Sequence, residues 1–97
     1  MAQKFLNIAG AATTTVKSGR GKLAKIICNK AVATGVITIY DNTAASGTKI
    51  GTITIPAAVL QSQYELDYTS STSAGVSFGT GLTIVTSAAD DLTVIYE

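Results

Sequence analysis

The sequence predicts an all-β fold, a single antiparallel β-sandwich of jelly-roll type with eight or nine short strands. Threonine, valine and isoleucine dominate the composition, and these residues favour pleated, half-buried strands over helices. Clusters of turn residues recur about every 8–12 residues, a spacing typical of sandwiches. The chain has 97 residues, 46% of them hydrophobic and 13% charged, which suits one domain with a modest core. We therefore expect residues 1–97 to form one domain, with 1–12 as an extended arm or edge strand.

The individual strands are expected where apolar or β-branched runs lie between turn clusters. The first is the short apolar run from Phe5 to Ala9, and the threonine-rich "TTTVK" follows it. Toward the end of the chain, "LTVIY" alternates Leu92 and Val94 against Thr93 and Ile95. The complete set of expected strands is 4–9, 13–17, 22–29, 35–41, 48–55, 63–69, 75–79, 82–87 and 92–97.

The strand at 22–29 is apolar on both faces. Strict alternation places Ala24, Ile26 and Cys28 on one face and Leu23, Lys25 and Ile27 on the other. A helix over "GKLAKIICNKAV" (21–32) remains an alternative, because Leu23, Ile26 and Ile27 also follow helical spacing. Cys28 is the single cysteine, so it forms no internal disulfide, and we expect it to be a small buried residue.

Residues 35–55 predict a β-hairpin. Ile37 and Ile39 share one face of the outgoing strand, and "DNTAASG" supplies the turn. On the returning strand Ile53 and Ile55 share a face, whereas Ile50 is out of phase with them. A β-bulge at Gly51 would bring Ile50 back to the core face.

The chain carries more apolar surface than one thin sandwich hides. A sandwich buries one face of each sheet, yet "KLAKIIC" and "LTVIY" are apolar on both faces. Leftover apolar faces usually mark an interface, so we expect a homo-oligomer. No apolar run approaches the ~18 residues of a membrane span, and we expect no membrane partner.

Charge is unevenly divided along the chain. Residues 1–30 carry six cations and no acid, while 31–97 carry one lysine and six acids, so the formal charges are +6 and −5. One explanation of this charge division is chance placement of the charged residues on solvated strand faces. Alternatively, Lys17, Arg20 and Lys22 in "VKSGRGK" face an acidic patch on a neighbouring copy or another partner.

Motifs that carry chemistry are scarce. "GRGKLA" matches part of a dinucleotide fingerprint, but it lacks the strand–helix context that such a site needs, so we expect a glycine turn with basic residues. The chain has no histidine, which removes histidine-dependent catalytic triads and the usual histidine metal sites. Glu65 and Asp67 in "YELDY" share a face, and "SAADDLT" around Asp90 and Asp91 is expected to be a turn. Phe5 is the single aromatic residue among the first thirty, so nucleic-acid binding is not expected.

The strand and turn pattern resembles small virion proteins encoded by tailed bacteriophages and prophages, of the capsid decoration (cement) or head protein type. The likeness is carried by "TTTVKSGRGKLAKIICNK", "GVITIYDNTAASGTKIGTITI" and "FGTGLTIVTSAADDLTVIYE", and it spans residues 13–97. It implies a non-enzymatic virion structural protein on the capsid surface, made in the host cytoplasm, that binds and stabilises the assembled capsid. The implied partners are further copies in a homotrimer and the major capsid protein, with no cofactor or metal.

Two other functions are compatible with the same residues: a phage tail or fibre component, and a small glycan-binding β-sandwich module. The expected contact surface combines the basic residues with the apolar outer face of the strand at 22–29. The candidate interface residues are Lys17, Arg20, Lys22, Leu23, Lys25 and Ile27.

Overall fold

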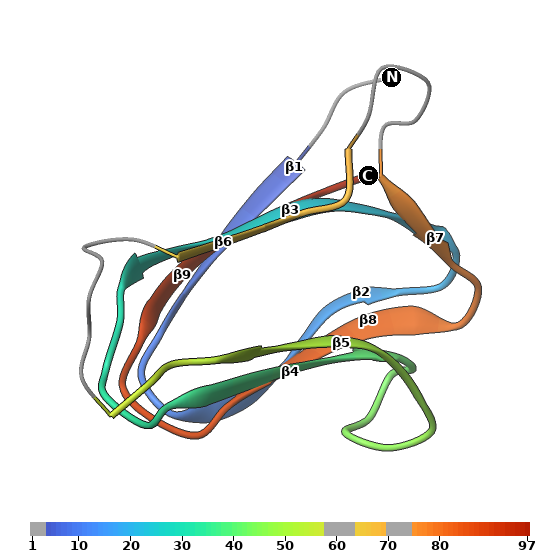
Figure 1. Ribbon diagram of the computed structural model, residues 1–97. Coiled ribbons are helices and arrows are strands. Elements are labelled where there is room, and N and C mark those ends of the chain that lie inside the picture. The colour runs from blue at the N-terminus through green and yellow to red at the C-terminus, as the bar shows by residue number, and fades with distance from the viewer. Residues whose placement is uncertain (1–3, 58–63, 70–74) are drawn as a thin grey trace.

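The computed structural model describes residues 4–57, 64–69 and 75–97, and they form a sandwich of two antiparallel sheets (Figure 1). The five-stranded sheet contains β1 (Lys4–Ala9), β9 (Asp91–Tyr96), β3 (Gly21–Lys30) and β6 (Tyr64–Asp67) in that order, and β7 (Val76–Phe78) also pairs with β3. The four-stranded sheet contains β2 (Ala12–Ser18), β8 (Gly81–Thr86), β4 (Val36–Asp41) and β5 (Thr48–Thr54). No helix occurs in the described ranges, and none of their segments meets the length and hydropathy of a membrane-spanning helix.

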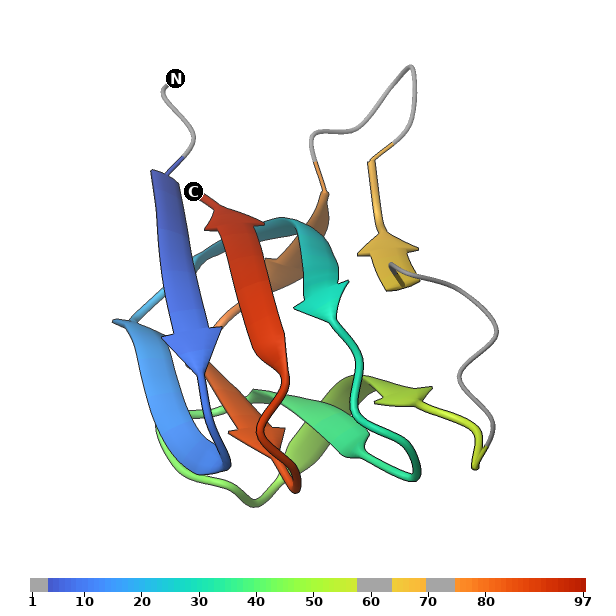
Figure 2. The same cartoon turned by 90° about the vertical axis from the view of Figure 1, so that its left-hand side faces the viewer.

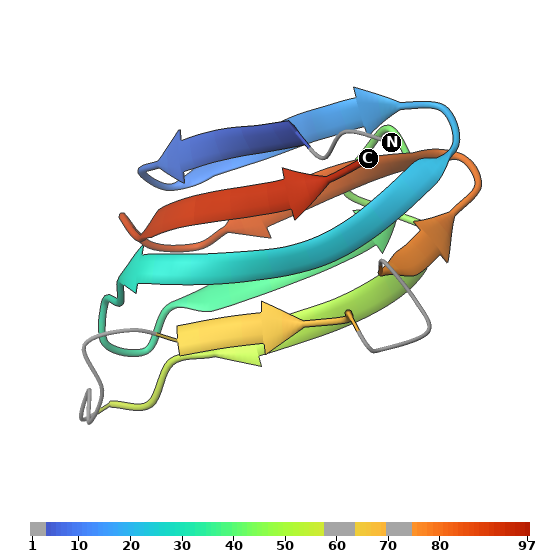
Figure 3. The same cartoon turned by 90° about the horizontal axis from the view of Figure 1, so that it is seen from above.

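The order of the strands is that of a jelly roll. Seen from above, β1 lies over β2, β9 over β8, β3 over β4 and β6 over β5 (Figure 3). The chain passes from one sheet to the other at most connections, and Figure 2 shows β1, β9 and β3 side by side in the nearer sheet. β4 and β5 are consecutive strands that pair as a hairpin. The predicted fold class is therefore confirmed, and the described strand ends lie within a few residues of those expected.

The core lies between the sheets, and in β4 and β9 it is built from alternate residues. The five-stranded sheet contributes fully buried side chains from its two central strands, Ile26 and Cys28 of β3 and Leu92 and Val94 of β9. The remaining members of the buried cluster are Ile8, Leu23, Ile37, Ile39, Phe78, Leu82 and Ile84. The helical alternative for 21–32 is wrong, because Gly21–Lys30 is a continuous strand paired with β9.

One face assignment in β3 is also wrong. Leu23 was expected on the outer face beside Lys25 and Ile27, but its side chain is fully buried in the core. The register with β9 shifts between Leu23, which pairs with Tyr96, and Lys25, which pairs with Ile95. The extra residue inverts the alternation, so Leu23 joins the core face and leaves the candidate interface.

The hairpin bulge is confirmed. Ile39 pairs with Gly51 and Tyr40 pairs with Lys49, so Ile50 is the additional residue and packs against the core. The structure adds a second reason for glycine at position 51. A Cβ atom there would collide with the hydroxyl of Tyr68, which reaches across from the β6 side of the sandwich.

The outer face of the five-stranded sheet carries the leftover apolar side chains. Phe5 on the edge strand β1 is 75% exposed and pairs with Ile95 of β9. Ile95 and Ile27 are half-buried and point away from the core, as expected. Lys25 also lies on this face, opposite Ile95.

Candidate functional site

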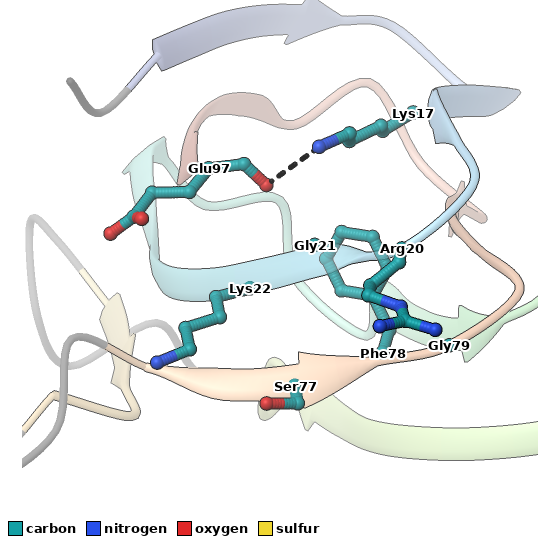
Figure 4. A pocket seen from close by; sticks show the side chains of 8 residues that line it. All are labelled: Lys17, Arg20, Gly21, Lys22, Ser77, Phe78, Gly79 and Glu97. Atoms are coloured by element: carbon teal, nitrogen blue, oxygen red, sulfur yellow. Dashed lines mark hydrogen bonds between the residues drawn. The ribbon is translucent and has the colours of Figure 1, made fainter. Parts of the chain in front are cut away.

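A hollow of about 620 Å³ opens at the end of the sandwich where β2 turns into β3 (Figure 4). Its residues come from the end of β2, the β2–β3 turn, the start of β3, β7, the β7–β8 turn and the residue after β9. We call this site the basic hollow. It is lined by Lys17, Arg20, Gly21, Lys22, Ser77, Phe78, Gly79 and Glu97.

Glycine geometry brings these segments together. Gly19 has a φ of 98°, which the β2–β3 turn requires and glycine adopts without strain, and its N–H donates to the Thr80 carbonyl at 2.9 Å. Gly21 then pairs with Phe78 of β7. A Cβ atom on Gly21 would lie 2.8 Å from the Phe78 ring and 3.0 Å from Lys17 Nζ, and it would collide with the Glu97 main-chain oxygen. Position 21 therefore has to be glycine for the walls of the hollow to meet.

Lys17 has a structural role within this site. Its Nζ donates to the main-chain oxygen of Glu97 at 3.1 Å, the contact drawn in Figure 4. Glu97 is also held against the start of β3, because its N–H donates to the Lys22 carbonyl at 2.8 Å and its oxygen accepts from the Lys22 N–H at 3.2 Å. The hydrogen bond from Lys17 therefore connects the end of β2 to the residue that follows β9.

Arg20 and Lys22 are the free cations of the hollow. Arg20 is exposed and Lys22 is half-buried, and within the described part of the chain neither side chain has an ion pair or hydrogen bond. In Figure 4 the two side chains extend on either side of Ser77, which pairs with Lys22 across β3 and β7. With Lys17 and the Glu97 carboxylate, the side chains at the hollow have a formal charge of +2, from three cations minus one acid.

The predicted interface residues therefore divide into three groups. Lys17, Arg20 and Lys22 meet at the hollow, and Leu23 is in the core. The third group, Lys25 and Ile27, lies on the outer face of the five-stranded sheet. Lys25 forms ion pairs there with β6, at 4.0 Å from Glu65 and 3.8 Å from Asp67.

Sequence reasoning missed the carboxylate that supports the far wall of the hollow. Asp41 ends β4 and was expected to serve its own hairpin turn, but it accepts hydrogen bonds from the N–H groups of Gly79, Thr80 and Gly81, at 3.2, 2.9 and 3.3 Å. The N–H groups of Thr80, Gly79 and Gly81, in decreasing order of effect, hold the pKa of Asp41 below its usual value. No local signal connects Asp41 to a turn nearly forty residues away.

β7 supplies the other lining residues that the sequence did not indicate. Ser77 is exposed and presents a hydroxyl, while the Phe78 ring is almost fully buried beside Gly21. Both follow from the pairing of β7 with the start of β3, a contact between segments more than fifty residues apart. Across the described residues, no group of three or more histidine, cysteine or acidic side chains is placed to hold a metal ion.

Comparison of the chain with protein-family models, with curated proteins and with solved structures finds no match.

Proposed function

We propose that this protein is a non-enzymatic virion structural protein that binds the assembled capsid of a tailed phage and stabilises it. The proposal starts from the resemblance of residues 13–97 to small phage decoration and head proteins. It assigns the protein two contact surfaces. One is the basic hollow, and the other is the apolar outer face of the five-stranded sheet around Phe5.

The observation that carries the proposal is that the free cations and the most exposed large apolar side chain of the described residues lie on open surfaces. Arg20 and Lys22 reach outward from a glycine turn, and Phe5 is 75% exposed on an edge strand. Such features suit a protein that acts through contact area. A protein that binds the assembled shell and not the separate subunits stabilises the assembly by linkage.

The test is to compare virions made with and without the gene for this chain. We expect electron microscopy to show added density on the head surface when the protein is present, and we expect the heads to lose DNA at a higher temperature. Purified protein added back to the deficient virions should restore both effects.

Density confined to the tail would favour a tail or fibre component instead. Absence of the protein from purified virions would contradict any virion role, and a glycan array would then test the sugar-binding alternative.

A further inference from the structure

The basic hollow has positive charge that the rest of the chain does not neutralise. All six acidic residues of the chain lie in the described ranges, and Glu97 is the one among them that lines this site. Asp41 is held by three main-chain N–H groups, and Glu65 and Asp67 flank Lys25. The remaining acids are Asp90, which is fully buried, Asp91, which accepts from Asn7 Nδ2 at 2.6 Å, and Glu97, which is already part of the hollow.

On a second copy of the chain, the exposed acidic pair that Arg20 and Lys22 could meet is Glu65 and Asp67, which already shares Lys25. Arg20 and Lys22 would have to compete with Lys25 for these two carboxylates. The charge balance therefore favours an anion from a different molecule over one from a second copy.

Most of the main-chain N–H groups around the hollow are already in use, and among the described residues no run of consecutive free ones converges there, which argues against a phosphate site. Phosphate is commonly held by consecutive main-chain N–H groups that converge on it. Here the N–H groups of Gly79, Thr80 and Gly81 donate to Asp41, and those of Gly19 and Lys22 donate to main-chain oxygens. We therefore expect side chains to make the main contacts with an anion bound at this site.

The side chains present match a carboxylate. The planar Arg20 guanidinium can donate two parallel hydrogen bonds to a carboxylate, and Lys22 adds a mobile point charge. Ser77 contributes an exposed hydroxyl donor between the two cations, while the Phe78 ring lies beneath the hollow, almost fully buried.

We propose that the basic hollow binds carboxylate side chains presented by an acidic segment of a partner protein. This inference rests on the proposed function, because it gives the chemistry of the surface to which the protein docks. Arg20 and Lys22 supply the charge, while Lys17 and Gly21 keep the hollow in shape.

The experiment titrates the whole ¹⁵N-labelled protein with a short blocked peptide of alternating glutamate and leucine, monitored by amide NMR. We expect saturable shifts at residues 20–22 and 77–79, which weaken as salt is added. The glutamine version of the peptide should give no such shifts.

Two matched variants separate local recognition from overall charge. Arg20→Glu with Lys22→Glu should weaken peptide binding by roughly tenfold or more, because two attractive contacts become repulsive. Lys30→Glu with Lys49→Glu makes the same change in net charge at two exposed lysines away from the hollow, and binding should stay within about twofold of the unmodified protein. The neutral pair Arg20→Gln with Lys22→Gln should lie between the two.

Equal weakening in both charge-reversed variants, or the absence of shifts around the hollow, would overturn the proposal. So would inorganic phosphate or a sulfated oligosaccharide that displaces the peptide at lower concentration than the peptide itself requires. The outcome is independent of the capsid test, since peptide binding without head binding would refute the proposed function and keep the acidic-peptide site.

Discussion

At the scale of single residues, several polar groups support the architecture at a distance from their own element. The Asp41 carboxylate, at the end of β4, accepts hydrogen bonds from three N–H groups of the β7–β8 turn. The Thr83 hydroxyl on β8 donates to the Asn42 carbonyl at 2.8 Å. Asp90 is fully buried between β8 and β9, and its Oδ1 accepts from the Val32 N–H at 2.8 Å. Periodicity does not show these contacts, because each depends on how distant loops meet after the sheets have formed.

Asp41 makes the first prediction, which concerns pH. Its pKa is lower in the folded protein than in the unfolded chain, so the ionised carboxylate stabilises the fold above the unfolded value, and this stabilisation disappears as pH falls through the folded pKa. Asp41→Asn should lower Tm at neutral pH, and the difference from the unmodified protein should close in acid. Thermal unfolding followed by circular dichroism between about pH 2 and 7 measures the difference.

Glu65→Gln is the matched control for this prediction. Glu65 is an exposed carboxylate on β6 that accepts no main-chain hydrogen bond within the described ranges. Its Tm difference should be smaller than that of Asp41→Asn at neutral pH. If Asp41→Asn and Glu65→Gln behave alike across the pH range, the three N–H contacts do not stabilise the fold.

At the scale of elements, sequence alternation predicts a strand well until a bulge interrupts it. The bulge in the hairpin could be predicted because Ile50 is out of phase with the other isoleucines of its strand and stands next to a glycine, Gly51. The bulge between Leu23 and Lys25 gives no such signal, because Leu23 and Ala24 are both apolar and either one could face the core, and Leu23 was therefore assigned to the wrong face. Half of the candidate interface residues meet at one hollow, but its β7 wall depends on a long-range pairing that the sequence does not reveal.

The hairpin supplies the second prediction. Ile39 is fully buried, so Ile39→Ala should cost about 2–5 kcal/mol in the free energy of unfolding through lost burial and a residual cavity. Thr43 is exposed in the turn, and its hydrogen bonds to Asn42 and Thr15 use main-chain atoms, so Thr43→Ala should cost less than ~0.5 kcal/mol. Chemical denaturation measures both values. Comparable losses would mean that the core face of β4 is assigned wrongly.

The third prediction concerns the contact between Gly51 and Tyr68. Gly51→Ala should destabilise the protein by roughly 1–3 kcal/mol, because the new methyl group meets the Tyr68 hydroxyl. Tyr68→Phe removes that hydroxyl and should recover part of the loss in the double variant, as a double-mutant cycle would show. Gly79→Ala is the control, since a Cβ atom there has open space. Additive effects of the Gly51 and Tyr68 changes would indicate that the two residues do not contact each other.

At the scale of the whole molecule, the two proposed surfaces differ in physical character. The basic hollow is expected to respond to salt, because its contacts are exposed ion pairs. The outer face of the five-stranded sheet carries Phe5, Ile95 and Ile27, and Lys25, which lies beside them, is already paired with β6. Association through that face would bury apolar area and depend little on salt.

The last prediction follows from this difference. We expect the protein to form a homo-oligomer, most simply a trimer, through the apolar outer face, and light scattering should give a multiple of the 9.9 kDa chain. Phe5→Asp should shift the population toward monomer without unfolding the protein, because Phe5 is 75% exposed and contributes little to the core. Thr52→Asp places the same charge on an exposed position of the other sheet and should leave the mass unchanged. Adding salt should leave the oligomer intact, since charge contacts between copies are not what holds it. A monomer at micromolar concentration, or an oligomer that Phe5→Asp leaves unaffected, would show that the exposed apolar face is reserved for another partner or has no part in assembly.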